Sequence, residues 1–289
     1  MAPKLPITFG ALRGIVREIQ VSTREQRPLV VGGASQLTKV LRRQLGKDAK
    51  PGGISPGDDP RGGAVFVYVL GHDPTEDDER ALKRARRARV PIVAVVVGPV
   101  SDDVSIPFVL ASDIVRVGAG QGFPVERIAR VIAALLGEDG APLAARVPAL
   151  RGPVCDALIS SFARRGGIVA AAVFIPGADL PVLLLNQIRL VLRLEQAYGL
   201  NPDPRERAPE LAVTLAAGFG LRAVARQLLA VIPVAGWAVQ GAVAYTGTRA
   251  LGEAAVKRLE IPIPVGAAPG GDGAGPVTRP QAGASRGAP

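Results

Sequence analysis

A glycine turn followed by a lysine-bearing helix is the first place in the chain where chemistry could occur. Residues 29–33, LVVGG, end in Gly32 and Gly33, and the helical pattern SQLTKVLRRQL follows with Lys39 inside it. Backbone N–H groups at such a turn can hold the phosphates of a nucleotide. A phosphate-binding loop also needs a second glycine before a Lys-Ser or Lys-Thr pair, whereas Thr38 precedes Lys39 here. Gly32, Gly33 and Lys39 therefore match the motif in part, and we expect no cofactor.

A second candidate is the acidic segment GHDPTEDDE. It places His72 close to Asp73, Asp77 and Asp78 in sequence, as a metal site would. Helix capping explains the same acids without a metal: Asp73 suits the N-cap, Pro74 the first helical position, and Glu76 completes a capping box. We therefore predict a helix start and no metal ion.

The nucleophiles of common hydrolases lack partners in this sequence. His72 is the only histidine, Cys155 is the only cysteine, and no serine stands in a nucleophile-elbow pattern. We therefore expect a protein that is not an enzyme. A single cysteine also excludes an intramolecular disulfide, and the N-terminal sequence lacks the apolar stretch of a signal peptide, so we expect an intracellular protein.

The formal net charge is +10, which by itself favours an anionic partner such as nucleic acid. The basic run KRARRAR at 83–89 has no aromatic residues within it, and basic residues also suit the C-terminal end of a helix. A genome of high GC content, which favours arginine codons, can produce the same net charge without any functional reason. We predict no specific nucleic-acid partner and keep that reading as an alternative.

These residues must be positioned by two different kinds of structure. Apolar runs at 29–33, 64–70, 91–98 and 111–117 alternate with helical patterns, which predicts a parallel sheet with right-handed crossovers. We therefore expect an α/β domain over 28–138, preceded by an N-terminal lead (1–27) and followed by a linker (139–152).

Strand patterns disappear after the linker. Longer apolar patterns predict four helices, which form a helical-hairpin domain over 153–260. Their expected ranges are 153–175, 180–200, 208–232 and 233–259. Glycine and proline dominate residues 261–289, which we expect to be a disordered tail.

Residues 233–248 carry no charge and contain many small side chains. Ala238, Ala242, Thr246 and Ala250 recur at every fourth position, which predicts a helix face where another backbone can approach closely. Two interpretations stay open: a hairpin in or on a membrane, or a soluble four-helix core.

The α/β region resembles, over 28–138, a small GTPase-like domain of the bacterial translation-factor type, in a degenerate form. The segment at 98–101 lacks the family's guanine-reading Asn-Lys-x-Asp motif, and the segment at 71–74 lacks its magnesium-binding Asp-x-x-Gly. The resemblance implies a P-loop GTPase-like fold without the hydrolysis.

Over 153–257 the chain is similar to a bacterial, GTPase-associated helical-hairpin domain of unknown function. Three segments carry this resemblance: PGADLPVLLLNQIRLVLRLEQAYG, AAGFGLRAVARQLL and PVAGWAVQGAVAYTGTRALGEAA. They supply Asp179, Asn186 and Trp237, which we predict to be interaction residues together with the alanine face. Asp179 also suits an N-cap.

The two resemblances imply a non-catalytic, membrane-associated or partner-binding module, a pseudo-GTPase joined to a helical hairpin. Its expected partner is a membrane or a partner helix, from a GTPase or from a second copy of the chain. Its expected location is the inner membrane of a bacterium, or otherwise the cytoplasm. The alternative is a nucleotide-binding GTPase-family protein with an atypical phosphate loop.

Overall fold

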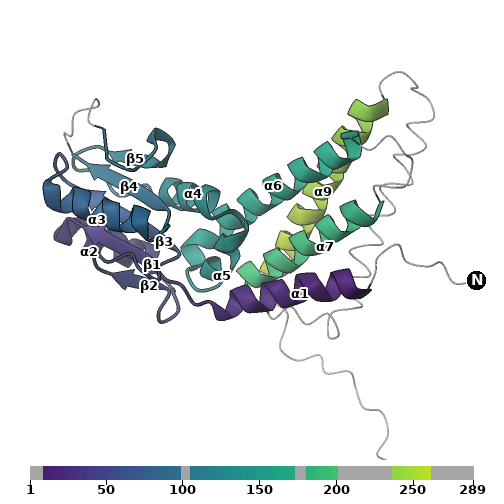
Figure 1. The fold of residues 1–289 in the computed structure, drawn as a ribbon, viewed down its shortest axis with the longest axis horizontal. Coiled ribbons are helices and arrows are strands. Elements are labelled where there is room, and N and C mark those ends of the chain that lie inside the picture. The colour runs from purple at the N-terminus through teal and green to yellow at the C-terminus, as the bar shows by residue number, and fades with distance from the viewer. Residues whose placement is uncertain (1–8, 99–104, 173–179, 201–235, 262–289) are drawn as a thin grey trace, which may run out of the picture.

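The computed structural model describes residues 9–98, 105–172, 180–200 and 236–261. A parallel sheet with its helices lies at one end of the molecule, and three long helices extend away from it (Figure 1). This arrangement confirms an α/β part followed by a helical part.

All five strands of the sheet are parallel, in the order β2-β1-β3-β4-β5. The apolar runs of the central strands are buried along almost their whole length, as expected for a parallel sheet covered on both faces. Their bounds are β1 (Leu29–Gly33), β2 (Ile54–Pro56), β3 (Val65–Leu70), β4 (Ile92–Val97) and β5 (Ile114–Val117).

Helices cover both faces of this sheet. α2 (Ser35–Leu45) and α4 (Val125–Leu136) pack on one face and form the larger hydrophobic core. α3 (Glu76–Arg87) packs on the other face and forms a smaller core with Phe66 and Tyr68. All three helices were expected from the sequence, and their apolar sides face the sheet.

The start of α3 differs from the prediction. The N-cap is Thr75 and not Asp73, and the capping box is completed by Asp78 and not Glu76. The helix therefore begins at Glu76, two residues after Pro74. The acidic residues of its first turn still face the positive end of the helix dipole.

The segment expected to be a linker is part of the hydrophobic core. It folds into two 3-10 turns, η2 (Gly137–Gly140) and η3 (Pro148–Leu150), with the short helix α5 (Ala141–Ala144) between them. The side chains of Leu143, Val147 and Leu150 are all buried in the larger core. The core therefore continues from the sheet into the helical part without interruption.

The helical part consists of α6 (Arg151–Ala172), α7 (Leu180–Ala197) and α9 (Gly236–Glu260), with α1 (Phe9–Arg24) beside α7 (Figure 1). α1 falls in the predicted N-terminal lead, and its Val16 and Ile19 pack against α7. Of the predictions for this part, the helix at 208–232, Asp179 and the tail beyond Ile261 lie outside the described residues. Within the described ranges, no helix combines the length and the hydropathy needed to cross a membrane.

Candidate functional site

The glycine turn after β1 is already occupied by a side chain of the protein itself. Gly33 has a φ of +98° and turns the chain into α2. Its N–H donates a 2.8 Å hydrogen bond to Oδ1 of Asp58, and the N–H of Ala34 donates to the carbonyl of Val69 at 2.9 Å. A Cβ on Gly32 would lie only 2.5 Å from the same carboxylate oxygen. The turn therefore holds a carboxylate where a nucleotide phosphate would need free N–H groups.

Lys39, the third residue that suggested nucleotide binding, lies away from this turn. Lys39 lies on an exposed side of α2 and lines an open groove with Arg42, Arg43 and Lys50. This groove includes Ile54, at the start of β2, whereas Gly33 ends β1. Ile54 pairs with Leu29 at the N-terminal end of β1, whereas Gly33 is at the C-terminal end. The groove and the glycine turn therefore lie at opposite ends of the parallel strands, and Lys39 is separate from the turn.

The acidic segment at the start of α3 forms a hydrogen-bonded cap. Asp78 accepts hydrogen bonds from the Tyr68 hydroxyl at 2.7 Å and from the Thr75 N–H at 2.8 Å. Burial raises the pKa of Asp78, but the hydrogen bonds from Thr75 and Tyr68 outweigh burial and lower the pKa below its ordinary value. The nearest His72 nitrogen lies 3.9 Å from Asp78. Across the described residues, no three metal-binding side chains converge.

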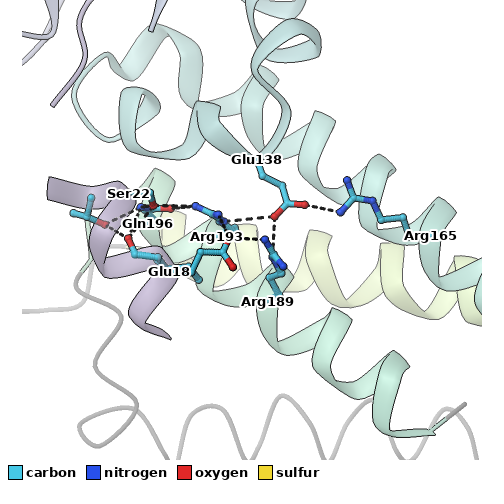
Figure 2. Close-up of polar contacts among 9 residues, drawn as sticks. Glu18, Ser22, Glu138, Arg165, Arg189, Arg193 and Gln196 are labelled. Carbon is cyan, nitrogen blue, oxygen red and sulfur yellow. Dashed lines mark hydrogen bonds and ion pairs between the residues drawn. The ribbon is translucent and has the colours of Figure 1, made fainter. Parts of the chain in front are cut away.

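The strongest polar network ties the helical part together (Figure 2). Glu138, in η2, accepts hydrogen bonds from Arg165 of α6 and from Arg189 of α7, the latter at 2.9 Å. Glu18 of α1 accepts from Arg189 and, at 2.9 Å, from Arg193. The Glu138 carboxylate therefore links the end of the α/β part to α6 and α7, and the Glu18 carboxylate links α1 to α7.

Arg193 is the buried centre of this network, with only 3% of its side chain exposed. Burial lowers the pKa of its guanidinium, and the charges of Glu138 and Glu18 oppose that shift. Its Nη1 also donates to Ser22 and Gln196, at 3.1 and 3.0 Å. Its Nε lies 3.7 Å from Glu138 and is buried without a hydrogen bond. The guanidinium is therefore enclosed by α1, η2 and α7, which leaves little room for a ligand. In the sequence, the signal for this buried network was the pair Arg189 and Arg193, four residues apart in an otherwise apolar helical pattern.

Asn186 lies where the three long helices meet. Its Nδ2 donates a 3.0 Å hydrogen bond to the carbonyl of Phe162 in α6. A Cβ on Gly166 would lie 3.6 Å from that amide nitrogen and 3.3 Å from the hydroxyl of buried Thr248 in α9. Asn186 therefore makes an internal contact between helices.

The close approach of α6 and α9 uses a different face from the predicted one. A Cβ on Gly241 would lie 3.0 Å from the carbonyl of Gly167. By contrast, Ala242, Thr246 and Ala250 are exposed. The alanine face is therefore not the face of α9 that packs on α6, and its contact with another helix stays a prediction.

Two predicted interaction residues, Trp237 and Ala238, cannot be placed in a contact. Trp237 and Ala238 belong to the first turn of α9, but their side chains lie outside the described residues. Comparison with known protein families, curated proteins and solved structures finds no match to this chain.

Proposed function

We propose that the protein is a non-catalytic binding module, in which a degenerate GTPase-like α/β part supports helices that associate with a membrane or a partner helix. The observation that carries this proposal is the hydrogen bond from the Gly33 N–H to the Asp58 carboxylate. In parallel sheets with this strand order, ligands bind outside the carboxyl ends of the strands, beside the first strand. A phosphate entering there would meet a negative charge and a donor that is already used.

Support for the association comes from apolar side chains on the outside of the long helices. Ile168 on α6 is 62% exposed and Val182 on α7 is 52% exposed. Ala242, Thr246 and Ala250 add small exposed side chains on α9. Small side chains let a second helix approach closely, either in lipid or in water. A GTPase and a second copy of this chain are the partner classes we propose first.

Titration of the full-length protein with fluorescent GTP and ATP tests the non-catalytic part of the proposal. We expect no saturable binding at the glycine turn. Removing the Asp58 charge (Asp58→Asn) would strengthen any binding there, whereas Lys39→Ala, in the separate groove, would leave it unchanged. Micromolar binding with that pattern of variants would overturn the proposal in favour of an atypical nucleotide-binding protein.

Cell fractionation tests the membrane part. We expect the protein in the membrane pellet, and a carbonate wash tells peripheral from integral association. If the protein stays in the supernatant, light scattering of the purified chain tests self-association. A monomer in the supernatant that binds neither vesicles nor a GTPase would contradict the proposed association.

A further inference from the structure

The groove between α2 and the loop that leads into β2 carries a concentrated positive charge. It has a volume of about 480 Å3 and is lined by four basic side chains, those of Lys39, Arg42, Arg43 and Lys50. None of these four pairs with an acidic side chain in the described part of the chain. Asp48, the only acid in the loop at 46–53, is not part of the lining. Four like charges therefore face one open space without compensation.

The loop that forms the floor of the groove is held in place by backbone hydrogen bonds. The N–H of Gly46 donates to the carbonyl of Arg42 at 2.8 Å, and the N–H of Lys50 donates to the carbonyl of Arg146 at 2.8 Å. The guanidinium of Arg146 donates to the carbonyl of Gly52 at 3.0 Å. Because the loop is fixed in advance, a ligand would not have to order it on binding.

The groove also lies against the helical part. A Cβ on Gly199, just after α7, would lie only 3.3 Å from Nζ of Lys50. The larger core runs from Leu45 and Ile54 beside the groove to Leu194 of α7. An anion held by Lys50 would therefore sit where the α/β part and the helices join, away from the glycine turn.

We propose that this groove binds a compact anion that carries two or more phosphate groups. Guanidinium groups bind phosphate through paired hydrogen bonds, and lysines supply point charges. A single carboxylate or phosphate would leave most of the positive charge unbalanced. The same chemistry is offered by a soluble polyphosphate compound and by a phosphorylated lipid headgroup. The inference is independent of the proposed function, because it concerns a different surface.

Calorimetric titration of the full-length protein with pyrophosphate is the direct test, alongside sedimentation with phosphatidylcholine vesicles that do or do not contain phosphatidylinositol 4,5-bisphosphate, whose headgroup carries more than one phosphate. Arg42→Gln/Arg43→Gln removes two charges from the last turn of α2. Arg86→Gln/Arg87→Gln is the matched control, because it removes two exposed arginines from the last turn of α3. Both variants have the same net charge, so only position distinguishes them.

We expect the groove variant to weaken binding about tenfold or more, because charge-assisted hydrogen bonds to phosphate are strong. The control should change it less than about twofold, because distant exposed charges are screened by salt. Pyrophosphate binding indicates a soluble ligand, and binding to the phosphatidylinositol 4,5-bisphosphate vesicles alone indicates a lipid headgroup. Equal losses in both variants, or no binding to either probe, would overturn the proposal. Lys39→Gln/Lys50→Gln, at two exposed positions, gives the same test if the arginine variant fails to fold.

Discussion

Gly252 in α9 should tolerate no side chain, because it faces Ile159 of α6. It is buried, and a Cβ there would lie 2.6 Å from Cγ1 of Ile159 and 3.1 Å from its Cδ1. Ordinary carbon contacts are about 3.5–4.0 Å, so one of the helices would have to move by about 1 Å. Adding a methyl group to a packed interface costs roughly 1–3 kcal/mol of folding free energy. Alanine also gains roughly 0.5–1 kcal/mol over glycine inside a helix.

Gly247 supplies the control on the same helix. A Cβ there meets nothing within 4 Å, so Gly247→Ala should keep the whole gain of helix propensity. The difference in free energy of unfolding between Gly252→Ala and Gly247→Ala then isolates the overpacking, about 1–3 kcal/mol. Urea unfolding followed by circular dichroism measures both variants, and the slope with urea should not change.

A double-mutant cycle checks that Ile159 is the cause. Ile159→Ala removes the three atoms nearest to the new Cβ, so Gly252→Ala should cost less in that background, with a coupling of about 1–3 kcal/mol. Ala242→Leu, on the exposed side of α9, should change stability by less than about 0.5 kcal/mol. Equal stabilities of Gly252→Ala and Gly247→Ala, with no coupling to Ile159, would refute the α6–α9 contact.

Three further expectations follow from buried polar groups. Arg193→Met should cost about 1–3 kcal/mol in urea unfolding, because it leaves the buried Gln196 amide oxygen without its hydrogen bond, whereas Arg189 and Arg165 still pair with Glu18 and Glu138; a cost below about 0.5 kcal/mol would contradict this. The lowered pKa of Asp78 stabilises the fold above the ordinary pKa, so the stability advantage over Asp78→Asn should shrink as the pH falls from roughly 5 to 3; an advantage that grows would be the wrong sign. Burial raises the pKa of Cys155 to about 12, so Ellman's reagent should label it only after unfolding.

The central strands were predictable because the apolar composition of each run is itself enough to indicate a buried strand. β1, β3 and β4 are continuous runs of valine, isoleucine and other apolar residues, which only a strand covered on both faces can bury in a short length. β2 escaped prediction because it has only three residues, ends in Pro56 and pairs with β1 alone. Its register depends on that neighbour, which no local pattern reveals.

The start of α3 shows how a tertiary contact chooses between two local patterns. Asp73 with Glu76 and Thr75 with Asp78 have the same spacing, and each pair sets an acid three residues after a side chain that can cap a helix. Tyr68, in the neighbouring β3, donates a hydrogen bond to Asp78 and so favours the second pair. The sequence could name the cap region, but the choice depended on a residue from another element.

The face of α9 that packs on α6 differs from the alanine face for a geometric reason. Residues four apart are turned by about 40° relative to one another, because each residue turns the helix by about 100°. The alanine series from 238 to 250 therefore drifts around the helix. The residues that approach α6 are Gly241, Tyr245, Thr248 and Gly252, spaced by four, three and four, which stay on one face. For the contact with α6, the signal in the sequence is the pair of glycines, Gly241 and Gly252.

The continuous core has a consequence for how the two parts can act. Leu143, Val147 and Leu150 of the segment between them are buried together with strand residues of β1 and with Leu158 of α6. A chain divided there would expose these side chains, at about 25 cal/mol for each Å2 of apolar surface, so neither part keeps its core alone. Glu138 adds an ionic link across the same junction, through Arg165 and Arg189. The helices are therefore rigidly coupled to the sheet, and an anion beside Lys50 would stabilise both parts at once.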